Sequence, residues 1–125
     1  MLKDVFNYGI KKVIIACGRT DLRVGLDGLV TLIRAKYKLN PLEEGTLFLF
    51  CGTKKDVIKG LIFEGDGFLL LTKRLTDGIY PWPATPDEAR ELSREQYDVL
   101  MNGFKVALLR RKLRSAKTPI GIKGS

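Results

Sequence analysis

Basic side chains gather at the end of this 125-residue chain, and the chemistry that such a cluster offers is the binding of phosphate. No acidic residue follows Asp98, whereas seven basic residues do: Lys105, Arg110, Arg111, Lys112, Arg114, Lys117 and Lys123. The rest of the chain holds the other 15 of the 22 Lys and Arg residues against all 14 Asp and Glu residues, so seven of the net +8 charges lie in the last stretch. A nearly neutral body with a cationic end is typical of a protein that binds a polyanion such as a nucleic acid.

Other basic residues extend this possible phosphate surface. Lys59 and the pair Lys73 and Arg74 fall on adjacent predicted strands, and Arg19 and Arg23 flank the start of a predicted helix. On one shared face they would form a continuous phosphate-binding surface. The alternative for the strand residues is an ordinary solvated strand edge, which discourages aggregation. The predicted nucleic-acid-binding residues are therefore Arg110, Arg111, Lys112, Arg114, Lys59, Lys73, Arg74, Arg19 and Arg23.

The cationic end has a second interpretation. Val106, Leu109 and Leu113 fall on one helical face among the basic residues, and a basic amphipathic helix can lie on anionic lipid. That apolar face is short and has no aromatic residue, so nucleic acid is the favoured partner. Trp82, between two prolines, could stack on a base, but a lone Trp beside a sheet is more often part of the core.

Catalytic chemistry has little support in this sequence. The chain has no histidine, which removes the commonest general base and metal ligand. Asp21, Asp27, Asp56, Asp66 and Asp77 are possible metal ligands of a nuclease, but their positions suit helix capping and turns, and no ligand-spaced cluster occurs. No glycine-rich phosphate loop is present. We predict no catalytic residues, no metal and no cofactor.

The two cysteines point to structure rather than chemistry. Cys17 and Cys51 each follow an apolar run and precede a glycine, and they form neither a CxxC pair nor a zinc framework. They are interpreted as buried, reduced thiols at strand ends; a disulfide or a reactive thiol is the alternative. The surrounding pattern recurs, as CGRTD and CGTKKD, and two such short matches fall within chance.

Apolar periodicity predicts the elements that position these residues. A β-branched run at 13–16 predicts a strand buried on both faces, and helical spacing follows over 22–38. Short apolar runs joined by Gly- and Asp-containing turns then predict strands at 47–50, 57–63, 68–72 and 79–82. Residues 85–88 and 93–96 each have the form of a helix-starting capping box, and Gly103 is expected to end the second helix in a left-handed conformation.

These elements predict an α+β fold: an antiparallel β-meander with a helix after the first strand and C-terminal helical segments. The predicted division is a compact α+β domain over 1–104 and a basic tail over 105–125, partly helical or disordered. No apolar run reaches the roughly 18 residues that span a bilayer, and the first dozen residues do not form a secretory signal. We expect a cytoplasmic protein.

Three stretches carry a family resemblance. Residues 17–29 (CGRTDLRVGLDGL), 47–83 (LFLFCGTKKDVIKGLIFEGDGFLLLTKRLTDGIYPWP) and 92–103 (LSREQYDVLMNG) resemble, in order and spacing, the accessory proteins called TnpB of the IS sixty-six family of bacterial insertion sequences. The resemblance implies a small protein encoded beside a separate DDE-type transposase and needed for efficient transposition. It does not imply the unrelated RNA-guided nuclease of the same name, and it assigns no catalytic role to any residue.

The predicted function is a non-catalytic accessory protein for transposition. It would bind DNA at the element's ends, the transposase, or both, with weak sequence preference and strong salt dependence. No membrane and no small-molecule substrate are expected. The alternative is a protein-interaction module that docks on the transposase through the sheet or first helix while the tail only maintains solubility. A metal-dependent nuclease is the least favoured alternative.

Overall fold

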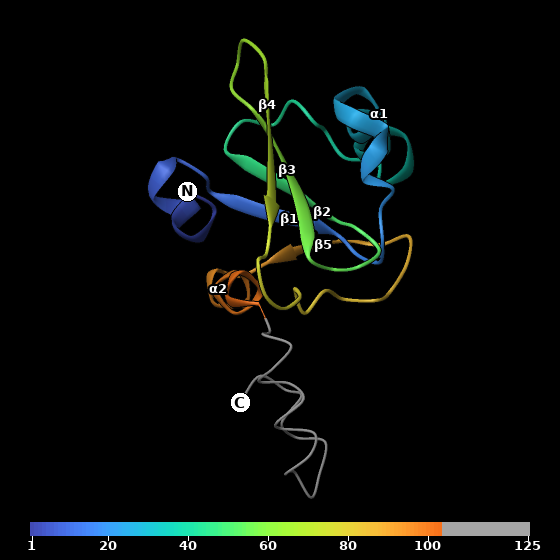
Figure 1. The fold of residues 1–125 in the computed structure, drawn as a ribbon. Helices are drawn as coiled ribbons and strands as arrows, with labels where there is room; N and C mark the ends of the chain where they lie inside the picture. Colours follow the sequence, from blue (N-terminus) through green and yellow to red (C-terminus); the bar gives the residue numbers. More distant parts are fainter. Residues whose placement is uncertain (104–125) are drawn as a thin grey trace, which may run out of the picture.

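The computed structural model describes residues 1–103, which build one sheet with helices on both faces (Figure 1). The predicted tail at 105–125, with its four candidate DNA-binding residues, lies outside the described residues. The sheet has five strands in the order β4-β3-β2-β1-β5. The strands are β1 (Lys12–Ala16), β2 (Thr46–Cys51), β3 (Val57–Phe63), β4 (Phe68–Arg74) and β5 (Ala89–Leu92).

The predicted antiparallel meander is confirmed for three strands. The strands β2, β3 and β4 form an antiparallel meander whose register pairs Leu47 with Ile62 and Phe63 with Phe68. The turn between β3 and β4 contains Gly65, whose positive φ of 92° suits glycine. These three strands lie at the predicted positions because their apolar runs and turn residues are local signals.

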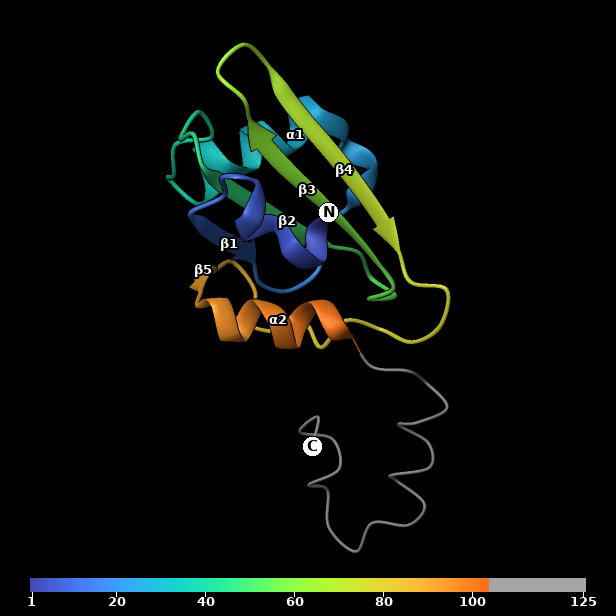
Figure 2. The ribbon, with the colours of Figure 1, turned by 90° about the vertical axis from the view of Figure 1, so that its left-hand side faces the viewer.

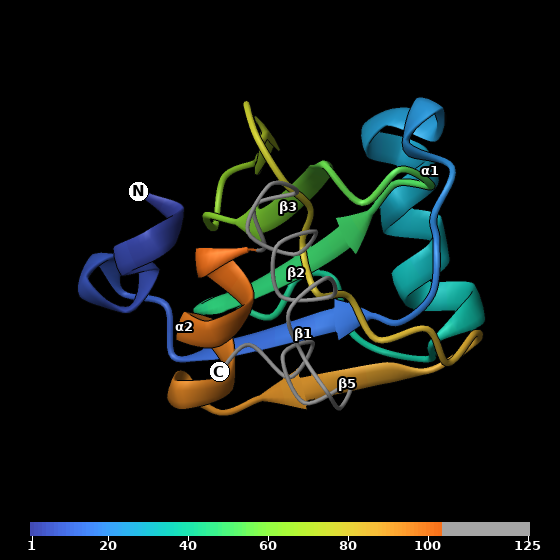
Figure 3. The same ribbon diagram turned by 60° about the horizontal axis from the view of Figure 1, so that its bottom comes forward.

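The purely antiparallel sheet is wrong. Strand β1 pairs in parallel with β2, with Val13 opposite Leu47 and Ile15 opposite Leu49, so the sheet is mixed (Figure 3). The helix between β1 and β2 allows this, because it carries the chain from the carboxyl end of β1 back to the end of the sheet where β1 began, so that β2 runs in the same direction. Four of the five β1 residues are buried, as suits a strand with neighbours on both edges.

Two further predictions fail in the segment that follows β4. The predicted strand at 79–82 is reduced to an isolated bridge at Ile79. The predicted capping box at 85–88 starts no helix, because Asp87 takes a positive φ of 59° and the chain enters β5, antiparallel to β1. Cys17 N–H donates to Glu88 O at 2.8 Å and fixes this entry. The hydrogen bonds that this segment gains by pairing with the free edge of β1 therefore override the local signal for a helix start.

The helix predicted at 22–38 is confirmed as three consecutive segments. These are the 3₁₀ turn η2 (Leu22–Val24), the α-helix α1 (Gly25–Thr31) and the π-helical η3 (Leu32–Lys36). Gly25 has a φ of 72°, which breaks the helix between η2 and α1. Leu29 and Ile33 are buried against Phe48 and Phe50 on one face of the sheet.

The opposite face is covered by the two ends of the described chain. The 3₁₀ segment η1 (Leu2–Tyr8) and the helix α2 (Arg94–Asn102) lie side by side there (Figure 2). The Phe6 and Tyr97 rings meet edge to face at 5.4 Å between centroids. The predicted capping box at 93–96 is confirmed, since Ser93 Oγ accepts from Gln96 N–H and Gln96 Oε1 from Ser93 N–H. Gly103 ends the helix with a positive φ of 65°, but its ψ of −174° lies outside the left-handed helical region, so the predicted left-handed conformation is wrong.

Candidate functional site

Lys59 and Lys73 do not share a face of the sheet, whereas Arg74, opposite Val57, lies on the Lys59 side. Lys59 points to the α1 side, where its Nζ donates to Leu22 O at 2.8 Å and so holds the start of the crossover helix. Lys73 lies opposite Ile58, which belongs to the core beneath η1 and α2. Because directly paired residues share a face and neighbours alternate, Lys59 and Lys73 point to opposite sides of the sheet. They form no continuous surface with each other.

The remaining described candidates differ in their partners. Arg23 is held by Asp21, with Nε–Oδ1 and Nη2–Oδ2 distances of 2.9 and 3.0 Å. The hydrogen bonds from Arg23 lower the pKa of Asp21 to about 2. Arg74 Nε lies 3.8 Å from Asp56 Oδ2. Arg19 is exposed and, within residues 1–103, makes no ion pair.

Arg19 belongs to a cavity that the parallel pairing creates, here called the basic pocket. A Cys-Gly pair lies at the carboxyl end of each strand, Cys17-Gly18 just after β1 and Cys51-Gly52 at the end of β2, and the carboxyl ends of parallel strands meet at one edge of a sheet. The two turns that looked like a chance repeat, CGRTD and CGTKKD, therefore lie together. The pocket has a volume of about 510 Å³, and its lining includes Gly18, Arg19, Lys36, Lys55, Pro83, Pro86 and Asp87.

Glycine is required where the pocket meets the chain after β1. Gly18 has a φ of 74°, and a methyl group on it would lie 3.3 Å from Pro86 Cα. Its N–H donates to Pro83 O at 2.8 Å, while Thr20 N–H donates to Cys51 O at 2.8 Å. These bonds tie the β1 turn to β2 and to the proline segment, so the walls of the pocket are fixed by backbone.

The charges of the basic pocket are three cations and one carboxylate. Lys36 Nζ lies 2.7 Å from Asp87 Oδ1, and this hydrogen bond raises the pKa of Lys36. Lys55 is exposed and has no ion-pair partner within the described part of the chain. Sequence reasoning missed Lys36 and Lys55 because it did not foresee the parallel pairing; the repeated Cys-Gly turn was the available signal.

The thiols beside this pocket are confirmed as free and buried. Cys17 is 2% exposed and Cys51 is 1% exposed. Burial raises the pKa of both thiols, and that of Cys51 to about 12. Since the thiolate is the reactive form, this burial disfavours nucleophilic chemistry at both sulfurs. Trp82 is also a core residue, 6% exposed, with its indole N–H donated to Ala16 O at 2.9 Å.

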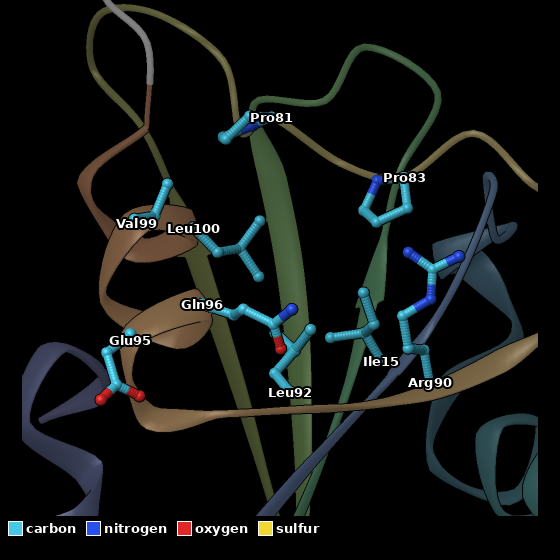
Figure 4. Close-up of a pocket in the computed structure, with 9 residues that line it drawn as sticks. All are labelled: Ile15, Pro81, Pro83, Arg90, Leu92, Glu95, Gln96, Val99 and Leu100. Carbon is cyan, nitrogen blue, oxygen red and sulfur yellow. The ribbon is translucent and has the colours of Figure 1, made fainter. Parts of the chain in front are cut away.

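A second cavity is mainly apolar and lies between α2, β5 and the proline segment (Figure 4). This apolar groove has a volume of about 370 Å³ and is lined by Ile15, Pro81, Pro83, Arg90, Leu92, Glu95, Gln96, Val99 and Leu100. Leu92 and Leu100 point into it from β5 and α2. Val99, at its rim, is 63% exposed and so presents apolar surface to solvent beside the groove.

Two features are absent from residues 1–103, a cluster of metal-ligating side chains and a membrane-spanning helix. Within that range no three His, Cys, Asp or Glu side chains are grouped so as to hold a metal ion. Asp21 is engaged instead as the cap of η2, where Oδ1 accepts from Arg23 N–H at 3.1 Å. In the same range no helix is long and apolar enough to cross a membrane.

Comparison with known proteins decides the family. The family model described as "IS66 Orf2 like protein" matches residues 11–111, which is most of the chain. The chain belongs to this family. It is therefore an insertion-sequence-associated protein of the kind that the three resembling stretches indicated, and this prediction is confirmed.

Two relatives from Sinorhizobium fredii illustrate the similarity. The chain is 38% identical to the uncharacterized protein y4hO over 93 residues, 74% of this chain and 80% of that protein. It is 29% identical to the uncharacterized protein y4jC over 101 residues, 81% of this chain and 86% of that protein. No solved structure matches the chain.

Proposed function

We propose that this protein is a non-catalytic accessory factor for transposition that contacts DNA phosphates through its basic residues, in the cytoplasm where the element's DNA lies. The observation that carries the proposal is the charge distribution in a member of an insertion-sequence family. Seven basic residues and no acidic residue follow Asp98. Binding of this kind comes largely from counterion release and is therefore strongly salt-dependent and weakly sequence-specific.

The contacts divide between the body and the tail. Arg110, Arg111, Lys112 and Arg114 supply the dense cluster, and Arg19 supplies an exposed cation on the body. Lys59 is committed to Leu22 O, so it contributes less than its position in the sequence indicates. Lys73 and Arg74 point to opposite faces as neighbours on one strand, so a single duplex meets at most one of them.

The test neutralises the tail cluster. A variant with Gln at Arg110, Arg111, Lys112 and Arg114 is measured by fluorescence anisotropy on a labelled duplex of the element's terminal repeat, over a salt series. The slope of log K against log salt should fall by about 3 to 4. The charge-matched control carries Gln at the exposed residues Lys3, Lys11, Arg34 and Lys38. An unchanged affinity and slope in the tail variant would sink the proposal.

The apolar groove favours a second function, docking on the transposase. Exposed apolar surface next to a groove marks protein-interaction sites. Val99→Lys places a charge at the rim, and Val24→Lys places one at another exposed valine, 43% accessible, outside the groove. Co-purification with the transposase after nuclease treatment should be lost only in Val99→Lys. A complex that disappears with nuclease alone was held by DNA, and docking would then be excluded.

A further inference from the structure

We propose that the basic pocket binds one nucleotide, with its phosphate between Arg19 and Lys55 and its sugar and base against the proline wall. The inference deepens the proposed DNA contact, because it names the ligand class of a site on the body rather than the tail. The phosphate-bearing nucleotide has two possible sources, an unpaired nucleotide of DNA or a free mononucleotide.

The shape of the pocket limits what can enter it. Its volume of about 510 Å³ lies in the range of small-ligand sites, roughly 300–1,000 Å³. The backbone of a duplex is a convex rod about which a flat or grooved surface can lie, whereas a concave pocket encloses a single residue of a strand. One nucleotide that has left the stack fits this geometry.

The charges favour a phosphate at the rim. Asp87 is neutralised by Lys36 at 2.7 Å, which leaves Arg19 and Lys55 as cations without an ion-pair partner in residues 1–103. Guanidinium and ammonium groups are the standard donors to phosphate oxygens. The pocket also opens at the carboxyl ends of adjacent parallel strands, the edge at which sheets with helical crossovers bind their ligands.

The opposite wall is apolar and open. Pro83 is half-buried, and Ala84 and Pro86 are exposed, so their side chains are available to pack against a sugar or base. Trp82 also lines the pocket, but it is 6% exposed and its N–H is bonded to Ala16 O, so it offers little surface for stacking. A phosphate site alone would need no such wall.

Backbone strain is concentrated at this pocket. Of the three non-glycine residues with positive φ among residues 1–103, Lys55 (64°) and Asp87 (59°) both line it. Lys55 is held in this conformation because Tyr80 N–H donates to its carbonyl at 2.7 Å. Such conformations cost free energy and persist where the surrounding structure fixes a functional side chain. In this pocket the two strained residues are Lys55, one of the proposed phosphate-binding cations, and Asp87, the carboxylate paired with Lys36.

Titration of the full-length protein with deoxythymidine 5′-monophosphate, followed by backbone-amide NMR, tests the pocket. Saturable shifts are expected at Gly18, Gly52 and Ala84, with much smaller shifts from thymidine or inorganic phosphate. Lys55→Ala should weaken binding about tenfold. Lys54→Ala removes the same charge from the neighbouring residue, which does not line the pocket, and should leave binding unchanged. The absence of saturable shifts, or equal weakening by both variants, overturns the inference.

A second arm separates the two nucleotide sources. Duplexes with blunt ends and with unpaired 3′ nucleotides are compared by anisotropy. If the unpaired end binds more tightly, and Lys55→Ala abolishes that advantage, the ligand is DNA. If the duplexes bind equally while the mononucleotide binds, the ligand is a free nucleotide, and the pocket stands in either case.

The tail-neutralised variant then separates this inference from the proposed function. It should retain the mononucleotide shifts, and their loss would place the site outside the pocket. If that variant instead keeps full duplex affinity, the proposed role of the tail fails while the nucleotide pocket stands.

Discussion

Two tyrosines in one core cluster differ in whether their buried hydroxyl groups are hydrogen-bonded. Tyr80 and Tyr97 are both fully buried. Tyr97 O–H donates to Leu2 O and so joins α2 to η1. Tyr80 O–H has no hydrogen-bond partner within residues 1–103, and burial raises its pKa to about 12. A buried polar group without a partner costs roughly 1–3 kcal/mol.

We predict opposite effects from removing these two hydroxyls. Tyr80→Phe should raise the free energy of unfolding by about 1 kcal/mol, because it removes an unpaired buried group. Tyr97→Phe should lower it by roughly 1–2 kcal/mol, because Leu2 O is left unsatisfied. Urea denaturation of both variants measures this. Equal destabilisation by the two would show that the Tyr80 hydroxyl is paired in solution.

At the scale of elements, the Cys-Gly turns convert a parallel strand pair into a pocket. The residues that follow β1 and β2 are drawn together by Thr20 N–H donating to Cys51 O, while Gly18 N–H reaches Pro83 O. Gly18 meets two demands at once, a positive φ and a close approach to Pro86. Gly9 meets only the first, since its φ is 87° and no atom lies within 4 Å of a Cβ placed there.

This pair of glycines yields a matched prediction. Gly9→Ala should lower the free energy of unfolding by about 1–2 kcal/mol, the cost of a left-handed conformation for a residue with a Cβ. Gly18→Ala should lower the free energy of unfolding by more than that, because the new methyl group would meet Pro86 Cα, a backbone atom that cannot rotate away as a side chain could. Chemical denaturation of both variants gives the difference. If Gly18→Ala costs no more than Gly9→Ala, the turn and the proline segment are not in tight contact.

For the whole molecule, the fold and the charge occupy different parts of the chain. The two described core clusters, one on each face of the sheet, are built from residues between Leu2 and Met101. The dense positive charge comes after Asp98. We propose the division at residue 104 from this separation, because the dense charge lies outside the stretch of chain that supplies the described core.

Truncation after residue 104 tests the division. The shortened chain should keep its melting temperature within about 2 °C, because no contact of the described core is lost. Its affinity for duplex DNA at low salt should fall with the seven lost cations. Thermal denaturation by circular dichroism and anisotropy measure the two effects. A marked fall in melting temperature would show that residues 105–125 pack on the body.

The sequence by itself determined what depends on neighbours along the chain. The strands at 13–16, 47–50, 57–63 and 68–72, the helix between the first two and the box at Ser93 are all set by apolar period, turn residues and capping. The family also followed from sequence, because its motifs are contiguous. Burial of Cys17 and Cys51 followed from the apolar runs before them.

Only the tertiary structure decided which segments lie together. The parallel pairing of β1 with β2 and the choice of strand over helix at 89–92 depend on hydrogen-bond partners far away in the chain. The separation of Lys59 from Lys73 depends on which face each residue takes once the register is set. The basic pocket, for the same reason, exists only because two distant turns end at one edge of the sheet.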